Sequence, residues 1–164
     1  MKATIYPIKA AAPNLIAIVA RPRGGDWLCD ELSALSREGI SVLVSMLTED
    51  ESKELGLQKE SEDCGAIAIR FVNLPIPDRS VPSDPSVFLH VVEQLAQLVR
   101  EGQFVAVHCR AGIGRSSVLV VSVLVRLGWE AGEAFDVVES ARGCSIPDTP
   151  EQRQWVIHNV PATR

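Results

Sequence analysis

The chain has 164 residues, of which 46% are hydrophobic and 23% charged, a composition that suits one globular domain with a sizeable core. Its net charge of −5 argues against a nucleic-acid binder, which usually carries a basic face. The longest apolar run is too short to span a bilayer, the start of the chain has no signal-peptide pattern, and the four cysteines form no CxxC pair. We therefore expect a cytoplasmic protein with free thiols, no membrane span and no nucleic-acid partner.

In the first half of the chain, short β-branched runs alternate with segments of helical pattern. The strands predicted there cover residues 4–8, 15–20, 40–47 and 66–76. A helix is predicted from Asp26, as its N-cap, to Gly39. Thr48 and Glu51 form a capping-box pattern, which predicts the start of a further short helix.

The second half continues this alternation and defines the fold class. Asp84, followed by Pro85, is predicted to cap a helix that ends at Gly102, and a strand follows over residues 103–109. Two smaller helices are predicted near the C-terminus, over residues 130–143 and 149–160. The sequence thus predicts one α/β domain over residues 1–164, with a central, mostly parallel sheet flanked by helices.

The segment HCRAGIGRSS, residues 108–117, links the last predicted strand to a valine-rich run. Propensity favours a strand for that run, but a helix there would gather the loop N–H groups and its own positive end around one point. The residues whose N–H groups would line this phosphate-binding cradle are Arg110, Ala111, Gly112, Ile113 and Gly114. Arg115 would hold two phosphate oxygens as a planar fork, and the same field favours the thiolate of Cys109, a nucleophile. The alternative is an ordinary strand-to-helix turn after a buried cysteine.

This segment resembles the signature His-Cys-x5-Arg-Ser/Thr of the cysteine-based protein phosphatases, and is most similar to their compact dual-specificity branch. The likeness extends from Ala20 to the last predicted helix. It implies that Cys109 attacks phosphorus to form a phosphocysteine, that Arg115 binds the phosphoryl oxygens, and that Ser116 stabilises the departing thiolate. It also implies that His108 supports the thiolate through hydrogen bonding, for which a merely buried histidine is the alternative.

The leaving oxygen of a phosphate ester needs a proton, and two aspartates precede the cradle. Asp84 is assigned to helix capping, whereas Asp78 lies in a proline-framed turn with no helix to cap. Its place before the cysteine resembles the general-acid loop of the family. We expect Asp78 to donate the proton and later to act as base on water; a solvated turn aspartate is the alternative.

Four further residues have weaker assignments. Gln152 matches the second of two water-positioning glutamines in tyrosine-specific relatives, but Asp148 stands where the first would be. Capping of the final helix by Asp148 or Thr149 is favoured over catalysis. Arg21 and Arg23 lie on a loop that borders the pocket in the family, where they would recognise a second phosphate or an acidic substrate flank. A solvated basic turn is the alternative for both arginines.

The sequence therefore predicts a phosphatase that hydrolyses phosphotyrosine, and phosphoserine or phosphothreonine as further substrates, without metal or cofactor. The expected partner is a phosphorylated protein or peptide, and a monomer is favoured. A phosphoinositide or inositol-phosphate substrate stays open, although such relatives usually carry extra lysines in the cradle. A catalytically inactive phosphate-binding module also stays open, although it would normally lose Cys109, Arg115 or Asp78. The order of acid and cysteine argues against a low-molecular-weight phosphatase.

Overall fold

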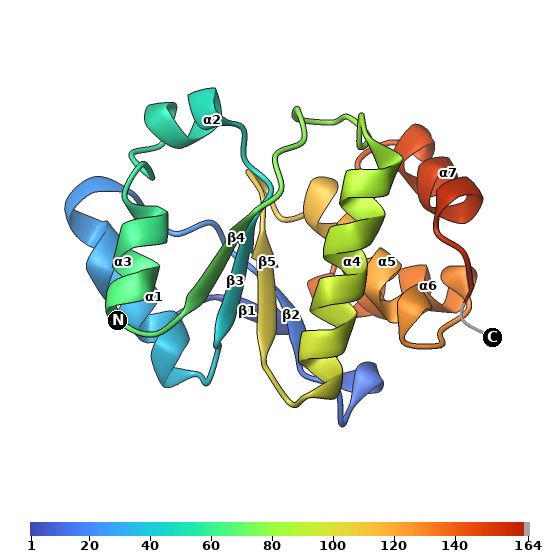
Figure 1. Cartoon of the computed structure of the whole chain (residues 1–164), viewed down its shortest axis with the longest axis horizontal. Coiled ribbons are helices and arrows are strands. Elements are labelled where there is room, and N and C mark those ends of the chain that lie inside the picture. Colours follow the sequence, from blue (N-terminus) through green and yellow to red (C-terminus); the bar gives the residue numbers. More distant parts are fainter. Residues whose placement is uncertain (163–164) are drawn as a thin grey trace.

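The computed structural model describes residues 1–162 and contains one five-stranded sheet with the order β1-β2-β5-β3-β4 (Figure 1). The strands are β1 (Ile5–Pro7), β2 (Ile16–Val19), β3 (Val42–Ser45), β4 (Arg70–Asn73) and β5 (Val105–His108). β1 runs antiparallel to β2, and the three other pairings are parallel. The prediction of a mostly parallel sheet in an α/β domain is confirmed.

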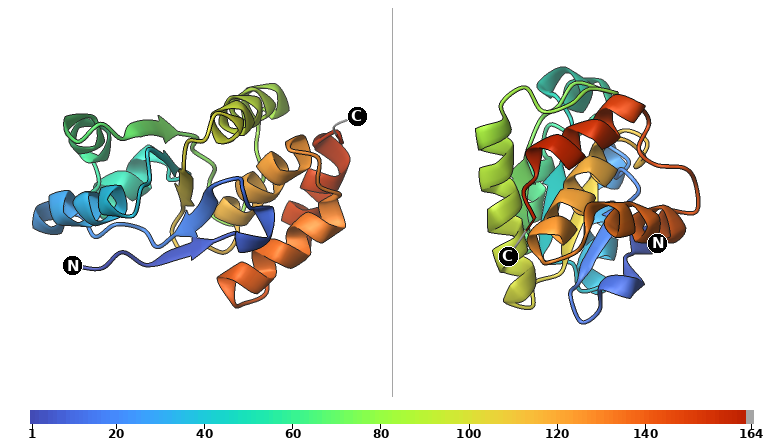
Figure 2. Two further views of the ribbon diagram at one scale, coloured as in Figure 1. Left: turned by 90° about the horizontal axis from the view of Figure 1, so that it is seen from below. Right: turned by 90° about the vertical axis from the view of Figure 1, so that its right-hand side faces the viewer.

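Helices cover both faces of the sheet (Figure 2). One face carries α1 (Leu28–Arg37) and α3 (Glu60–Ala66). On the other side lie α4 (Pro85–Arg100), α5 (Arg115–Arg126), α6 (Ala131–Arg142) and α7 (Pro150–Asn159). The short α2 (Glu49–Glu54) lies beyond the carboxyl ends of the parallel strands, at the top of Figure 1. No helix within residues 1–162 is long and apolar enough to cross a membrane.

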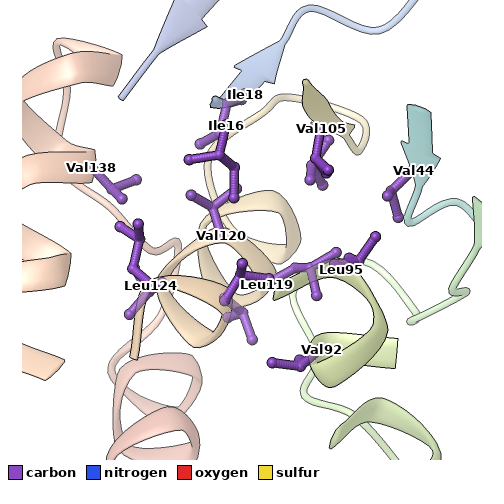
Figure 3. Packing of buried hydrophobic residues seen from close by; sticks show 14 of the residues in the cluster. Ile16, Ile18, Val44, Val92, Leu95, Val105, Leu119, Val120, Leu124 and Val138 are labelled. Carbon is purple, nitrogen blue, oxygen red and sulfur yellow. The ribbon is translucent and has the colours of Figure 1, made fainter. Parts of the chain in front are cut away.

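The valine-rich run forms α5, which lies at the centre of the larger part of the core. Every residue from 115 to 125 is buried. Leu119, Val120 and Leu124 of α5 lie among side chains of the sheet, such as Ile16 and Val105, and side chains of α4 and α6 (Figure 3). Contacts on all sides stabilise the helix well beyond the few tenths of a kcal/mol per residue by which propensity disfavours valine. The predicted helix is confirmed.

The chain between α2 and β4 differs from the prediction. The strand expected over residues 66–76 begins only at Arg70, because α3 and a turn occupy residues 60–69. Ile69 is buried at this turn, although it is not part of a strand. The apolar residues that favoured a longer strand belong to this turn, where Ile69 and Ile67 pack against the core.

The predicted N-cap at Asp26 is wrong, and Thr149, not Asp148, caps the final helix; the predicted caps Thr48 and Asp84 are confirmed. Asp26 lies in a 3-10 turn, Gly25–Trp27, and α1 begins without a side-chain cap bond. The N–H of Gly25 donates to the carbonyl of Gly56, at 2.9 Å, and this contact holds the chain in the turn before α1. Asp84 accepts bonds from two N–H groups at the start of α4, and both Thr48 and Thr149 form capping boxes.

Candidate active site

Cys109 follows the central strand β5 directly, and Arg115 is the first residue of α5. The loop between them therefore lies at the carboxyl edge of the sheet, where a helix N-terminus meets it. Gly112 adopts φ 70°, in the left-handed region that favours glycine, and its N–H donates to Sγ of Cys109, with 3.2 Å between N and Sγ. A backbone donor thus already faces the sulfur of the buried cysteine.

The loop is held from its outer side by Arg142 of α6. The Arg142 guanidinium donates to the carbonyl of Gly112 at 2.9 Å and to the carbonyl of Ala111 at 3.1 Å. It also stacks over the ring of Tyr6, 4.3 Å from the ring centroid. Arg142 thus satisfies the carbonyls of Ala111 and Gly112 on the outer side of the loop. The N–H groups of the loop can then face the inner side, toward a bound anion. The sequence analysis did not single out Arg142, since nothing local relates it to the loop.

The guanidinium of Arg115 is buried and anchored along one edge. Nη1 donates to the carbonyls of Met46 and Ile76, at 3.3 and 2.7 Å, and to Oε1 of Glu51 at 2.7 Å. Nη2 donates to Oε2 of Glu51 at 3.0 Å and to Oδ1 of Asp78 at 3.1 Å. Nε is buried and has no hydrogen-bond partner within residues 1–162. The anchored side chain therefore keeps one strong donor for an incoming acceptor.

Glu51 provides most of this anchor and also caps α2 together with Thr48. Burial by itself would raise the pKa of Glu51, but hydrogen bonds from Arg115 and Thr48 outweigh it and lower the pKa. Burial likewise opposes the charge of Arg115, yet its pKa is raised by the Glu51 bond and by the nearby charges of Cys109 and Asp78. The capping-box pattern with Thr48 already accounts for Glu51 in the sequence, so no local pattern indicates its contact with Arg115.

Asp78 lies in the turn that follows β4, at the same edge of the sheet. Its side chain is 49% exposed even though it contacts Arg115. The next residue, Arg79, adopts φ 62°, a strained conformation for a residue other than glycine. Asp84, by contrast, is taken up by the cap of α4. The structure thus brings Asp78 to the cradle and directs Asp84 away from it.

Two more predicted residues, Ser116 and His108, are fully buried. The hydroxyl of Ser116 has no hydrogen-bond partner in the part of the chain that the structure describes. His108 pairs through Nε2 with Oε1 of Glu60 on α3, at 2.5 Å. The sequence analysis did not single out Glu60, because α3 is short and polar and was not predicted as a helix.

Gln152 is buried at the start of α7 with its amide already bonded. Nε2 donates to the carbonyl of Ser80 at 3.1 Å, and Oε1 accepts from the N–H of Thr149. Gln152 therefore links α7 to the turn that carries Asp78. A Cβ on Gly114 would lie 2.2 Å from a carboxylate oxygen of Asp148, so a larger residue here would require that side chain to move.

Arg110 and the two arginines predicted to recognise substrate, Arg21 and Arg23, have different partners. Arg110 donates to Glu54, at 3.2 and 3.4 Å, on the outer side of the loop. Arg23 forms an ion pair with Glu31 at 2.9 Å. Arg21 is half-buried, and its Nε has no partner among residues 1–162.

The chain is similar in sequence to cysteine-based phosphatases. A family model described as "Polymorphic toxin system, DSP-PTPase phosphatase" matches residues 18–129. "Tyrosine-protein phosphatase 1" of Caenorhabditis elegans is 32% identical over 91 residues, which cover 51% of this chain and 9% of that protein. "Dual specificity protein phosphatase 22" of Mus musculus is 27% identical over 89 residues, which cover 52% of this chain and 47% of that protein. The matches therefore span less than half of each of these relatives.

Solved structures share the fold along nearly the whole chain. A kinase-associated phosphatase, with serine in place of its catalytic cysteine, matches with a TM-score of 0.83 at 17% identity, covering 95% of this chain and 92% of that one. Tk-PTP in its active form matches with a TM-score of 0.76 at 23% identity, covering 96% and 95%. The family model includes the segment from Asp78 to Arg115. The chain belongs to the DSP-PTPase family, the compact dual-specificity branch of the cysteine-based phosphatases.

Proposed function

We propose that this phosphatase-family chain hydrolyses phosphotyrosine, and also phosphoserine and phosphothreonine, in proteins or peptides through a phosphocysteine intermediate. The observation that carries the proposal is the state of Arg115. Its guanidinium is buried and fixed by Glu51, while Nε has no partner within residues 1–162 and the thiol of Cys109 precedes it in the same loop. A buried N–H without an acceptor is costly, and a phosphoryl oxygen would satisfy it.

In the first half-reaction, the cradle N–H groups and Nε of Arg115 would hold the phosphoryl oxygens. Sγ of Cys109 attacks phosphorus, and the S–P bond forms as the P–O bond to the leaving group breaks. Asp78 gives its proton to the departing oxygen. Asp78 contacts Nη2 of Arg115, and a bound phosphoryl group would compete for that contact. Its half-exposed carboxyl is then available to the leaving group.

In the second half-reaction, water attacks the phosphocysteine. The P–S bond breaks, its electron pair returns to sulfur, and Asp78 accepts the proton of the attacking water. The hydroxyl of Ser116, which is buried and unpartnered in the described part of the chain, donates to the departing thiolate. The products are the dephosphorylated side chain and inorganic phosphate, and the chain's own donors supply the positive field.

The small number of basic side chains in the cradle favours a protein substrate over a phosphoinositide. Arg110 is the one basic residue between Cys109 and Arg115, and it is paired with Glu54. A multiply phosphorylated inositol ring would need several uncommitted cations around the cradle. PTPMT1, a neighbour at 22% identity and a TM-score of 0.71, has been solved with PI(5)P, so lipid phosphates belong in the test.

The test is hydrolysis of a small aryl phosphate in chelator-containing buffer across pH. We expect wild type to turn over, Cys109→Ser to be inactive, and Asp78→Ala to lose kcat together with the basic limb of the pH profile. Cys29→Ser is the matched control, because this exposed thiol is bonded to Asp63 and should not affect turnover. Panels of phosphopeptides and phosphoinositides then separate the substrate classes. An inactive wild type that binds a phosphopeptide would replace the proposal with a phosphate-binding module.

A further inference from the structure

A buried ionisable pair lies one residue before the nucleophile. The side chain of His108 is 0% exposed and that of Glu60 is 2% exposed, and 2.5 Å separates Nε2 from Oε1. His108 is the last residue of β5, and Glu60 is the first residue of α3. The pair thus joins the end of β5 to the start of α3 through side chains.

The backbone of His108 is already fixed without this pair. Its carbonyl accepts from the N–H of Met46 at 2.9 Å, and the residue is in parallel register with Ser45. The remaining freedom is the orientation and protonation of the ring, and Glu60 contacts the ring directly. Nδ1 is also buried and has no partner within residues 1–162.

A buried carboxylate is a weak source of stability. Its desolvation costs several kcal/mol, and replacement of such pairs by apolar residues is often neutral or stabilising. Glu60 and Cys64 are the two buried residues of α3, and an apolar residue could fill the position of Glu60 as well. A charged group in this place, in contact with the residue before Cys109, is therefore better explained by an effect on the site.

We propose that Glu60 is a positioning residue for Cys109 that acts through His108, a role that rests on the proposed phosphocysteine chemistry. The carboxylate accepts the Nε2 proton and so fixes the orientation of the ring. The fixed ring holds the residue before Cys109, and so Sγ, in the geometry in which the N–H groups of the cradle can stabilise a thiolate.

Other ionisable groups lie around the pair and enter the pH dependence. They are Asp63 and Cys64 on α3, Glu49 and Lys53 on α2 along the same groove, and Cys109 after β5. Burial, followed by the charges of Glu60 and Asp63, raises the pKa of Cys64 to about 12. Cys64 therefore stays a thiol through the neutral range and does not compete with Cys109 in a thiolate assay.

The test is the rate of iodoacetamide alkylation of Cys109, read from the mass of its peptide between about pH 5 and 8. This readout needs no turnover, so it separates the failure of this inference from the failure of the proposed function. We expect Glu60→Gln to slow alkylation about fivefold to tenfold at the acidic end and to move the midpoint of the profile to higher pH. Glu62→Gln, at an exposed position of the same helix, is the control and should match wild type.

A double-mutant comparison decides whether the effect passes through His108. In a His108→Gln background, the further change Glu60→Gln should have little additional effect, because coupled residues are non-additive. A full additional loss in that background, or a Glu60→Gln profile equal to wild type, would overturn the inference.

Wild-type protein offers a second measurement that does not depend on how the variants fold. The chain has three histidines, His90, His108 and His158, so the ring nitrogens are assignable by NMR. We expect the His108 ring to carry its proton on Nε2 throughout the pH range. A neutral ring with its proton on Nδ1 alone would contradict the role of Glu60.

Discussion

Two carboxylates contact the guanidinium of Arg115, and they differ in almost every other respect. Glu51 is 13% exposed, uses both oxygens on Arg115, and belongs to a capped helix. Asp78 is 49% exposed, uses one oxygen, and lies in a turn. Arg115 is thus held by Glu51 through two bonds and by Asp78 through a single bond that can be displaced. The comparison indicates a structural role for Glu51 in the cradle, whereas the half-exposed Asp78 fits the acid role proposed above.

The largest expected effect comes from Asp78→Ala, and it should depend on the leaving group. We expect kcat to fall about 10²–10³-fold on a phosphotyrosine peptide, whose phenoxide needs a proton. The loss should be below about tenfold on an aryl phosphate with a strongly acidic phenol. Steady-state kinetics on both substrates measure the ratio. Asp84→Ala, the matched control, should cost about 1 kcal/mol of stability and leave that ratio unchanged. Equal losses on the two substrates would remove the acid role from Asp78.

Glu51→Gln should have the next largest effect, without regard to the leaving group. A neutral amide is a weaker acceptor for Arg115, so we expect kcat/KM to fall about 10- to 30-fold on both substrates. Inhibition by inorganic phosphate should weaken in parallel. Glu49→Gln serves as control, since the side chain of Glu49 is 83% exposed and pairs with Lys53. A loss of kcat/KM only on the substrate with the poor leaving group would mean that Glu51 takes part in protonation of the leaving group, as proposed for Asp78. It would contradict the distinction between the two carboxylates.

The charge of Glu51 should also appear in the pH dependence of stability. Its folded-state pKa lies below the ordinary value of 4.5, so its contribution is present above that value and is lost as pH falls through the folded pKa. We expect wild type to exceed Glu51→Gln by roughly 1 kcal/mol at neutral pH, after allowance for solvent screening. Urea unfolding at a series of pH values should show this difference vanish below the ordinary pKa. A difference independent of pH would mean that packing, and not charge, stabilises the contact.

The smallest expected effect is that of Gln152→Ala. This change removes the bond to the Ser80 carbonyl and half of the capping box of α7, so we expect about 1 kcal/mol less stability and a roughly twofold to threefold lower kcat. Thermal unfolding and kinetics measure both quantities. Gln154→Ala, at an exposed position of the same helix, is the control. A hundredfold loss of kcat would instead support water positioning by Gln152.

The sequence was most informative where local chemistry and the fold require the same residues. The loop from Cys109 to Arg115 predicted a helix over a valine-rich run, although propensity favoured a strand. The structure confirms that helix because α5 is buried on all sides. The position of Asp84 before Pro85 predicted a capping role and so distinguished Asp84 from Asp78. The structure confirms the cap of α4.

The sequence was least informative where a residue acts across the fold. Glu51 already had a complete local explanation, so its second contact, with Arg115, left no trace in the pattern. Glu60 lies in a short helix with too few apolar residues to show a period, and only the packing of α3 brings it to His108. Asp26 failed as a cap because the backbone contact between Gly25 and Gly56, distant in sequence, determines how α1 begins.

The order of the sheet also has a consequence for biosynthesis. Among the strands of residues 1–162, β5 is the last in sequence, yet it lies between β2 and β3. A nascent chain that has not yet released β5 from the ribosome can form only the separate pairs β1–β2 and β3–β4. The facing edges of β2 and β3 then remain open to association with other chains. Emergence of β5 closes those edges and in the same event brings Cys109, the residue after β5, to the carboxyl edge of the sheet.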